Sequence, residues 1–89
     1  SGTISTLFRA IFENMFGVRL GLEHFAISPC MPEQLLPASL TTEIRGKKVE
    51  ITIHSDCKEA VVNHTAYPFG APIPYDALNG DGCNVIEVF

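Results

Sequence analysis

The first part of the chain has apolar residues at the spacing of a helix. Between Ile4 and Phe16 they recur three and four positions apart, and polar residues occupy most of the other positions. This pattern is typical of an amphipathic helix with one apolar face. Hydroxyl side chains before Ile4 can cap its start, and Gly17 suits the left-handed conformation that ends many helices. We therefore predict a helix from about Thr3 to Phe16 with a phenylalanine-rich apolar face.

After Gly17 the pattern changes to the alternation that is typical of β-strands. Two hairpins are expected, one from segments 18–20 and 25–28 and one from segments 40–44 and 49–53, the second with its turn at 45–48. Three prolines favour an extended, irregular path over 67–74. Further short strands are predicted at 60–63 and 84–89, with a turn at 79–82 between them.

One helix followed by five or six strands with regular turns predicts a mainly β chain. We expect an N-terminal amphipathic helix followed by a small antiparallel β-sandwich, with the helix docked on it. The predicted organisation is a helical segment at 1–17 and a sandwich domain at 18–89.

Composition sets limits on what so short a chain can do. Its 89 residues fit a single small domain, which has little apolar surface to spare for a deep pocket and makes a self-contained enzyme for a large substrate unlikely on size alone. Ten acidic and six basic residues leave a net charge of -4, so nucleic acid and anionic membranes are poor partners. Three singly spaced cysteines predict a reducing compartment, and the cytoplasm is the expected location. The chain begins with Ser1 and not with methionine, so we expect it to be a processed product, to carry tag residues at its start, or to be a piece of a longer protein.

The titratable residues do not form a clear catalytic or metal-binding motif. The histidines and cysteines lack the short paired spacing of zinc ligands, so no metal is expected. Segment 79–82 is interpreted as a turn and not as part of a calcium loop, because the later bidentate glutamate is missing. A cysteine–histidine pair or a pair of carboxylates could meet only through the fold, and no spacing selects one. The glycosylation acceptor pattern at Asn63 has meaning only in a secreted protein.

The start of the predicted helix is the remaining candidate for a site. A helix N-terminus presents unpaired amides and a partial positive charge, and a glycine there lets an anion approach the backbone. Ser1, Gly2 and Thr3 could therefore hold a phosphate through their hydroxyls and amides. The alternative for these residues is a simple helix cap.

Five segments of the first 53 residues form a recognisable series: Ser1-Gly2-Thr3, Phe8-Arg9-Ala10, Phe16-Gly17-Val18-Arg19, Ile27-Ser28-Pro29-Cys30-Met31-Pro32 and Glu43-Ile44-Arg45-Gly46-Lys47. Together they resemble the C-terminal end of the inverting glycoside phosphorylases, which include cellobiose, chitobiose and β-1,2-oligoglucan phosphorylases. In that family a short Thr-Gly segment begins the last helix of a catalytic (α/α)6 barrel, and an I-D-P-C-I-P motif opens a C-terminal β-sandwich. The present sequence has Ser28 where the family usually has aspartate, and Ser1 where it often has threonine.

The resemblance implies a role in phosphorolysis of β-glycosidic bonds. Inorganic phosphate is the co-substrate of those enzymes, attacks the anomeric carbon and yields an α-sugar 1-phosphate. It implies that Ser1 and Gly2, with Thr3 as a neighbour, contact this phosphate, and that the general acid lies in an upstream barrel. The expected partner is then that barrel, and the isolated chain is expected to have no activity, to need no cofactor and to associate through its helix.

Two other functions are kept as alternatives. The first is a free-standing β-sandwich that binds carbohydrate or protein, with Tyr67, Phe69 and Tyr75 as a sugar-stacking platform. The second is an independent hydrolase that uses cysteine or carboxylate side chains.

Overall fold

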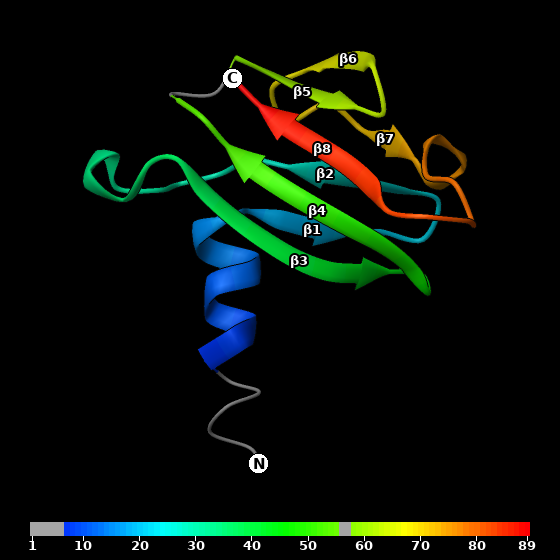
Figure 1. The fold of residues 1–89 in the computed structure, drawn as a ribbon, viewed down its shortest axis with the longest axis horizontal. Coiled ribbons are helices and arrows are strands. Elements are labelled where there is room, and N and C mark those ends of the chain that lie inside the picture. Colours follow the sequence, from blue (N-terminus) through cyan, green and yellow to red (C-terminus); the bar gives the residue numbers. More distant parts are fainter. Residues whose placement is uncertain (1–6, 56–57) are drawn as a thin grey trace.

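The computed structural model describes residues 7–55 and 58–89, and these form two β-sheets packed face to face (Figure 1). The three-stranded sheet has the order β1-β2-β7 and the five-stranded sheet the order β3-β4-β8-β5-β6. The strands are β1 Val18–Leu20, β2 His24–Ile27, β3 Ala38–Ile44, β4 Lys47–Ile53, β5 Glu59–Val62, β6 Thr65–Pro68, β7 Ile73–Pro74 and β8 Asn84–Val88. Short 3-10 turns lie at Glu33–Leu35 and Tyr75–Ala77.

The predicted helix is present where the structure describes it. Residues 7–10 are α-helical and continue into a π-helical turn, η1, over Ile11–Met15. The turn closes with a hydrogen bond from the Phe16 amide to the Ile11 carbonyl. The predicted start of the helix, from Thr3 to Thr6, lies outside the described residues.

The core lies between the two sheets and follows the predicted alternation. Ile44, Val49 and Ile51 have no exposed surface, and Phe25 and Ile27 cover them from the three-stranded sheet. Opposing residues of β3 and β4, such as Leu40 and Ile51, lie on the same side of the sheet because the register pairs them directly. A mainly β chain with a sandwich-like arrangement of two sheets and one N-terminal helix is thus confirmed.

Some details differ from the prediction. The second hairpin turns through Arg45 and Gly46 alone, both with positive φ, so Lys47 and Lys48 belong to β4. The pairing of β4 with β8 is parallel, whereas the other strand pairs are antiparallel as expected. The proline-rich stretch contributes to both sheets, with Pro68 at the end of β6 and Pro74 at the end of β7. Proline is tolerated at these places because both strands lie at sheet edges.

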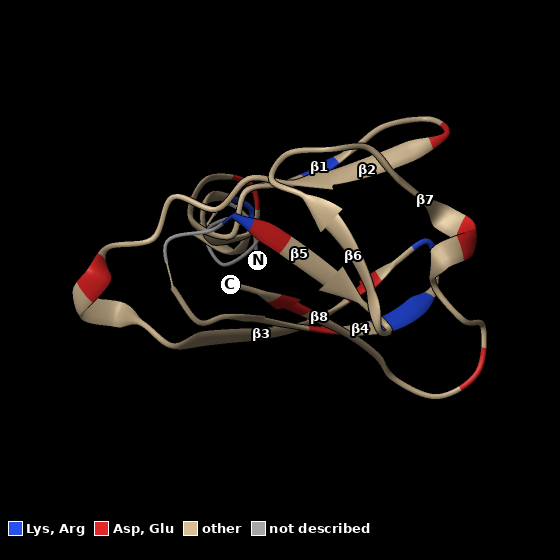
Figure 2. Cartoon of the chain, turned by 90° about the horizontal axis from the view of Figure 1, so that it is seen from above, with Lys and Arg blue, Asp and Glu red and all other residues tan. Residues whose placement is uncertain are grey.

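Charged side chains are spread around the fold. Figure 2 shows β3, β4 and β8 along one side and β1 and β2 along the other, with β5 and β6 between them and with Lys and Arg in separate places and not on one common face. In the part of the chain that the structure describes, no helix is long and apolar enough to cross a membrane.

Candidate functional site

The predicted phosphate contacts, Ser1, Gly2 and Thr3, lie outside the described residues. The structure does describe the other end of the same helix, where it joins the sandwich. This joint contains two of the segments on which the family resemblance depends.

The joint is made by a close backbone approach between Gly17 and Ser28. The Ser28 amide donates to the Gly17 carbonyl at 2.9 Å, and the Cys30 amide donates to the Met15 carbonyl at 2.9 Å. Gly17 has φ +65°, and a Cβ added there would lie 1.9 Å from the Ser28 carbonyl oxygen. Only glycine fits this position, because other residues would be both strained and in collision.

The two motifs of the joint are thus in direct contact. Immediately after Gly17, Val18 pairs with Ile27 in the hairpin of β1 and β2, and both side chains are buried. The motif around Gly17 and the motif that begins at Ile27 therefore fasten the helix to the three-stranded sheet. Their spacing in the sequence has a structural reason that is independent of any catalysis.

The helix leaves the sandwich as it is followed back towards its start. Phe16 is 4% exposed and Phe12 9%, but Phe8 is 43% and Leu7 63% exposed. The Phe8 ring stacks on Phe12 with 5.6 Å between centroids, so the aromatic row continues from the core into solvent. Figure 1 shows this half of the helix projecting away from both sheets. In the described part of the chain, the apolar face of the helix is thus buried at Phe12 and Phe16 and exposed at Leu7 and Phe8.

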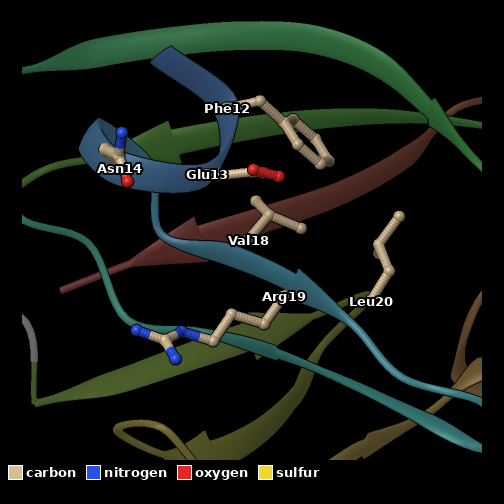
Figure 3. Close-up of a pocket in the computed structure, with 6 residues that line it drawn as sticks. All are labelled: Phe12, Glu13, Asn14, Val18, Arg19 and Leu20. Carbon is tan, nitrogen blue, oxygen red and sulfur yellow. The ribbon is translucent and has the colours of Figure 1, made fainter. Parts of the chain in front are cut away.

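A hollow of about 430 Å³ lies between the helix and β1 (Figure 3). Its walls combine the apolar side chains of Phe12, Val18 and Leu20 with a single carboxylate, that of Glu13. In Figure 3 the Glu13 carboxylate lies beside Phe12 and Val18, while the Arg19 side chain extends in another direction. Hydrolysis of a glycosidic bond normally uses two carboxyl groups, one on each side of the bond. The lining residues of this hollow supply one.

The Arg45 side chain connects the turn between β3 and β4 with the turn between β1 and β2, and so links the two sheets. Its guanidinium donates to the carbonyls of Gly21 and Leu22, at 3.1 and 2.7 Å, and lies 4.1 Å from the centre of the Tyr75 ring. The Tyr75 hydroxyl donates to the same Gly21 carbonyl at 2.6 Å. The hairpin motif that contains Arg45 and Gly46 therefore holds the β1–β2 turn in place.

The three aromatic residues proposed as a sugar platform have separate surroundings. Tyr75 is covered by Arg45 on its ring and packs against Phe25 at 5.5 Å between centroids. Tyr67 is half-buried and packs against the core, and Phe69 is 49% exposed. No ring contact joins the three among the described residues. Of the three, Tyr75 already has both Arg45 and Phe25 as ring neighbours.

A buried asparagine network was not predicted from the sequence. Asn84 is 1% exposed and donates to the carbonyls of Lys48 and Asn79, both at 2.9 Å. Its Oδ1 accepts from the Asn79 amide at 2.6 Å and from Asn63 Nδ2 at 2.7 Å. The sequence signal that could have indicated this network is the polar Asn84 on the strand face that also carries the apolar Ile86 and Val88. The hydrogen bonds to Asn79 hold the start of the turn at 79–82 in place. Asn63 Nδ2, the atom to which a glycan would be attached, is already hydrogen-bonded.

The histidines and cysteines are scattered. His54 Nε2 lies 2.9 Å from Glu87 Oε2, and its ring stacks on Phe89 at 4.8 Å between centroids. Cys30 and Cys83 are exposed free thiols, and Cys57 lies outside the described residues. Over 7–55 and 58–89, no three histidine, cysteine or acidic side chains gather in a way that could hold a metal ion.

Comparison of the chain with protein-family models and with curated proteins gave no match, so the resemblance to glycoside phosphorylases depends on the motifs themselves.

Proposed function

We propose that this chain is the C-terminal part of a glycoside phosphorylase-like enzyme, in which the sandwich anchors the last helix of an upstream catalytic barrel. The observation that carries the proposal is the helix itself. Its second half is locked into the sandwich at Gly17 and Phe16, whereas Phe8 and Leu7 continue the same apolar face into solvent. A helix that packs against both a sandwich and a barrel must bury one part of its apolar face against each of them.

The anchoring suggests how the module serves catalysis. The predicted helix from Thr3 to Phe16 would be about 20 Å long at 1.5 Å per residue. The backbone contacts of Gly17 and Met15 with the segment after Ile27 fix one end of it. The other end would present Ser1, Gly2 and Thr3 to inorganic phosphate, held by hydroxyl groups and by the amides of the helix start.

The reaction proposed for the whole enzyme is phosphorolysis. A phosphate oxygen bonds to the anomeric carbon, the β-glycosidic C–O bond breaks, and a general acid of the barrel gives its proton to the leaving oxygen. The products are an α-sugar 1-phosphate and the shortened saccharide. The present chain would contribute phosphate contacts and positioning, with no activity alone. The exposed free thiols of Cys30 and Cys83 support the cytoplasm as its compartment.

The experiment starts from the gene. The coding sequence before the Ser1 codon is determined, and the complete protein is expressed and incubated with β-linked disaccharides, with and without inorganic phosphate. We expect an upstream helical region and phosphate-dependent formation of sugar 1-phosphate. Replacing Ser1 by alanine should raise the KM for phosphate more than the KM for the sugar. A start codon directly before Ser1, or cleavage by water alone, would refute the proposal.

Titration calorimetry on the 89-residue chain addresses the alternative of a free-standing binding module. We expect no heat of binding with β-linked oligosaccharides, because Tyr75 is already covered by Arg45. Saturable binding would favour the alternative.

A further inference from the structure

The outer edge of β3 has little of the protection that is usual for exposed sheet edges, because its one charged residue is Glu43. In the described part of the chain β3 pairs with β4 alone. The other edges are short or interrupted: β1 has Arg19 at its centre, β6 ends in Pro68, and β7 has two residues and ends in Pro74. β3 has seven residues with no proline and no basic side chain. Unprotected edges of this kind pair readily with another strand.

The register shows which backbone groups of β3 are free. The hairpin closes with Ile44 opposite Lys47 across the two-residue turn, whose residues both have positive φ. In such a turn the closing pair is hydrogen-bonded, so the even-numbered residues of β3 bond to β4. Ser39, Thr41 and Glu43 therefore direct their N–H and C=O groups away from β4, towards the open edge.

We propose that a second copy of this chain pairs with β3 in antiparallel orientation, about a two-fold axis at Thr41. This register places Thr41 opposite Thr41 of the second copy and Ser39 opposite Glu43, and each of these pairs can exchange both N–H···O bonds. It overlaps the strands over their full length. The odd-numbered side chains, which are exposed, remain together on the polar face, and the even-numbered ones remain on the core side.

Charge favours this register and a second copy as the occupant. Glu43 is the only charged residue between Ala38 and Ile44, and pairing about Thr41 sets it against a serine hydroxyl that can donate to it. Pairing about Glu43 would set two carboxylates directly opposite each other, which is destabilising. The strand is thus complementary to itself in the one register that also gives full overlap.

The neighbouring surface can add to the contact. β1 and β3 are edge strands of different sheets, and both lie towards the lower border of the fold in the view of Figure 1. Leu20 of β1 is 52% exposed and lines the hollow beside Phe12. A second copy on β3 would continue the five-stranded sheet into the sheet of its partner, as in other isologous dimers.

A charge exchange at Thr41 tests the proposal by analytical ultracentrifugation of the 89-residue chain. We expect the unmodified chain to dimerise, and both Thr41→Lys and Thr41→Glu to raise the dimer dissociation constant at least about fivefold through like charges at the axis. An equimolar mixture of the two variants should form a heterodimer. Thr65→Lys, an exposed position on the opposite edge of the same sheet, is the matched control and should dimerise like the parent.

A proline pair checks the backbone assignment. Thr41→Pro removes an amide that faces the open edge, so the chain should fold and be monomeric. Thr42→Pro removes an amide that bonds to β4 and should lower the melting temperature strongly. A monomeric parent chain, dimers of Thr41→Lys as tight as those of Thr65→Lys, or no heterodimer in the mixture would overturn the proposal. So would association that persists in Thr41→Pro but is lost when Leu7 and Phe8 are replaced by serine, because the helix would then be the contact.

Discussion

Replacing Gly17 by alanine should separate the helix from the sandwich. The added Cβ would lie 1.9 Å from the Ser28 carbonyl oxygen and 2.8 Å from the Pro29 nitrogen. The backbones must therefore move apart by more than 1 Å to reach ordinary contact distance, as judged from the spacing of real Cβ contacts. Such a movement breaks the hydrogen bonds from Ser28 to Gly17 and from Cys30 to Met15.

The magnitude follows from two costs. The left-handed conformation costs a residue with a Cβ about 1–2 kcal/mol. The two broken hydrogen bonds add about 1 kcal/mol each. The total of about 3–4 kcal/mol is a large part of the 5–15 kcal/mol that is usual for a small domain.

Gly46→Ala is the matched control. Gly46 also has a positive φ, at +75°, but no atom lies within 4 Å of its added Cβ. Its replacement should therefore cost only the conformational part, about 1–2 kcal/mol. Thermal unfolding monitored by circular dichroism measures both variants. We expect the melting temperature of Gly17→Ala to lie about 8–16 °C below that of Gly46→Ala. Equal losses would refute the close approach at the joint.

Three further predictions concern side chains. Asn84→Ala should lower the free energy of unfolding by about 3 kcal/mol, because it removes the four hydrogen bonds of a buried side chain, and a loss below about 1 kcal/mol in urea unfolding would contradict the network. Replacing Leu7 and Phe8 together by serine should reduce binding of a hydrophobic dye without changing the β signal in circular dichroism, whereas unchanged dye binding would place the exposed apolar surface elsewhere. Glu87→Gln should change stability by less than about 1 kcal/mol, because its pair with His54 is partly exposed, and a larger loss would show a stronger coupling.

The two hairpins could be predicted because their information is local. Alternation selects the buried face of each strand, and Gly46 or the segment at Gly21 marks the reversal between strands. The core residues Val49, Ile51 and Ile53 follow directly, since they are the apolar members of the alternation. The helix was predictable from its spacing for the same reason.

Features that depend on distant parts of the chain were missed. Nothing near Val49 indicates that it will pair in parallel with Asn84, because that choice depends on the whole path between them. The prolines at 68 and 74 suggested an irregular segment, although edge strands accept proline. Asn84 could be recognised as buried from its strand face, but its partners come from three separate loops and strands. The phosphate contacts predicted at Ser1, Gly2 and Thr3 remain a prediction.

The functional proposal has two parts, the anchoring of the helix and the binding of phosphate, and they depend on different residues. The motif at Gly17 and the motif at Ser28 contact each other, and Arg45 holds the turn at Gly21, so these positions have structural reasons for their identity. A protein could therefore keep this joint for its geometry while its chemistry differs. The phosphate assignment depends instead on Ser1, Gly2 and Thr3. If the proposal holds, replacing Ser1 in the complete protein should change the KM for phosphate and leave folding intact, whereas replacing Gly17 should destabilise the fold whatever the function of the protein.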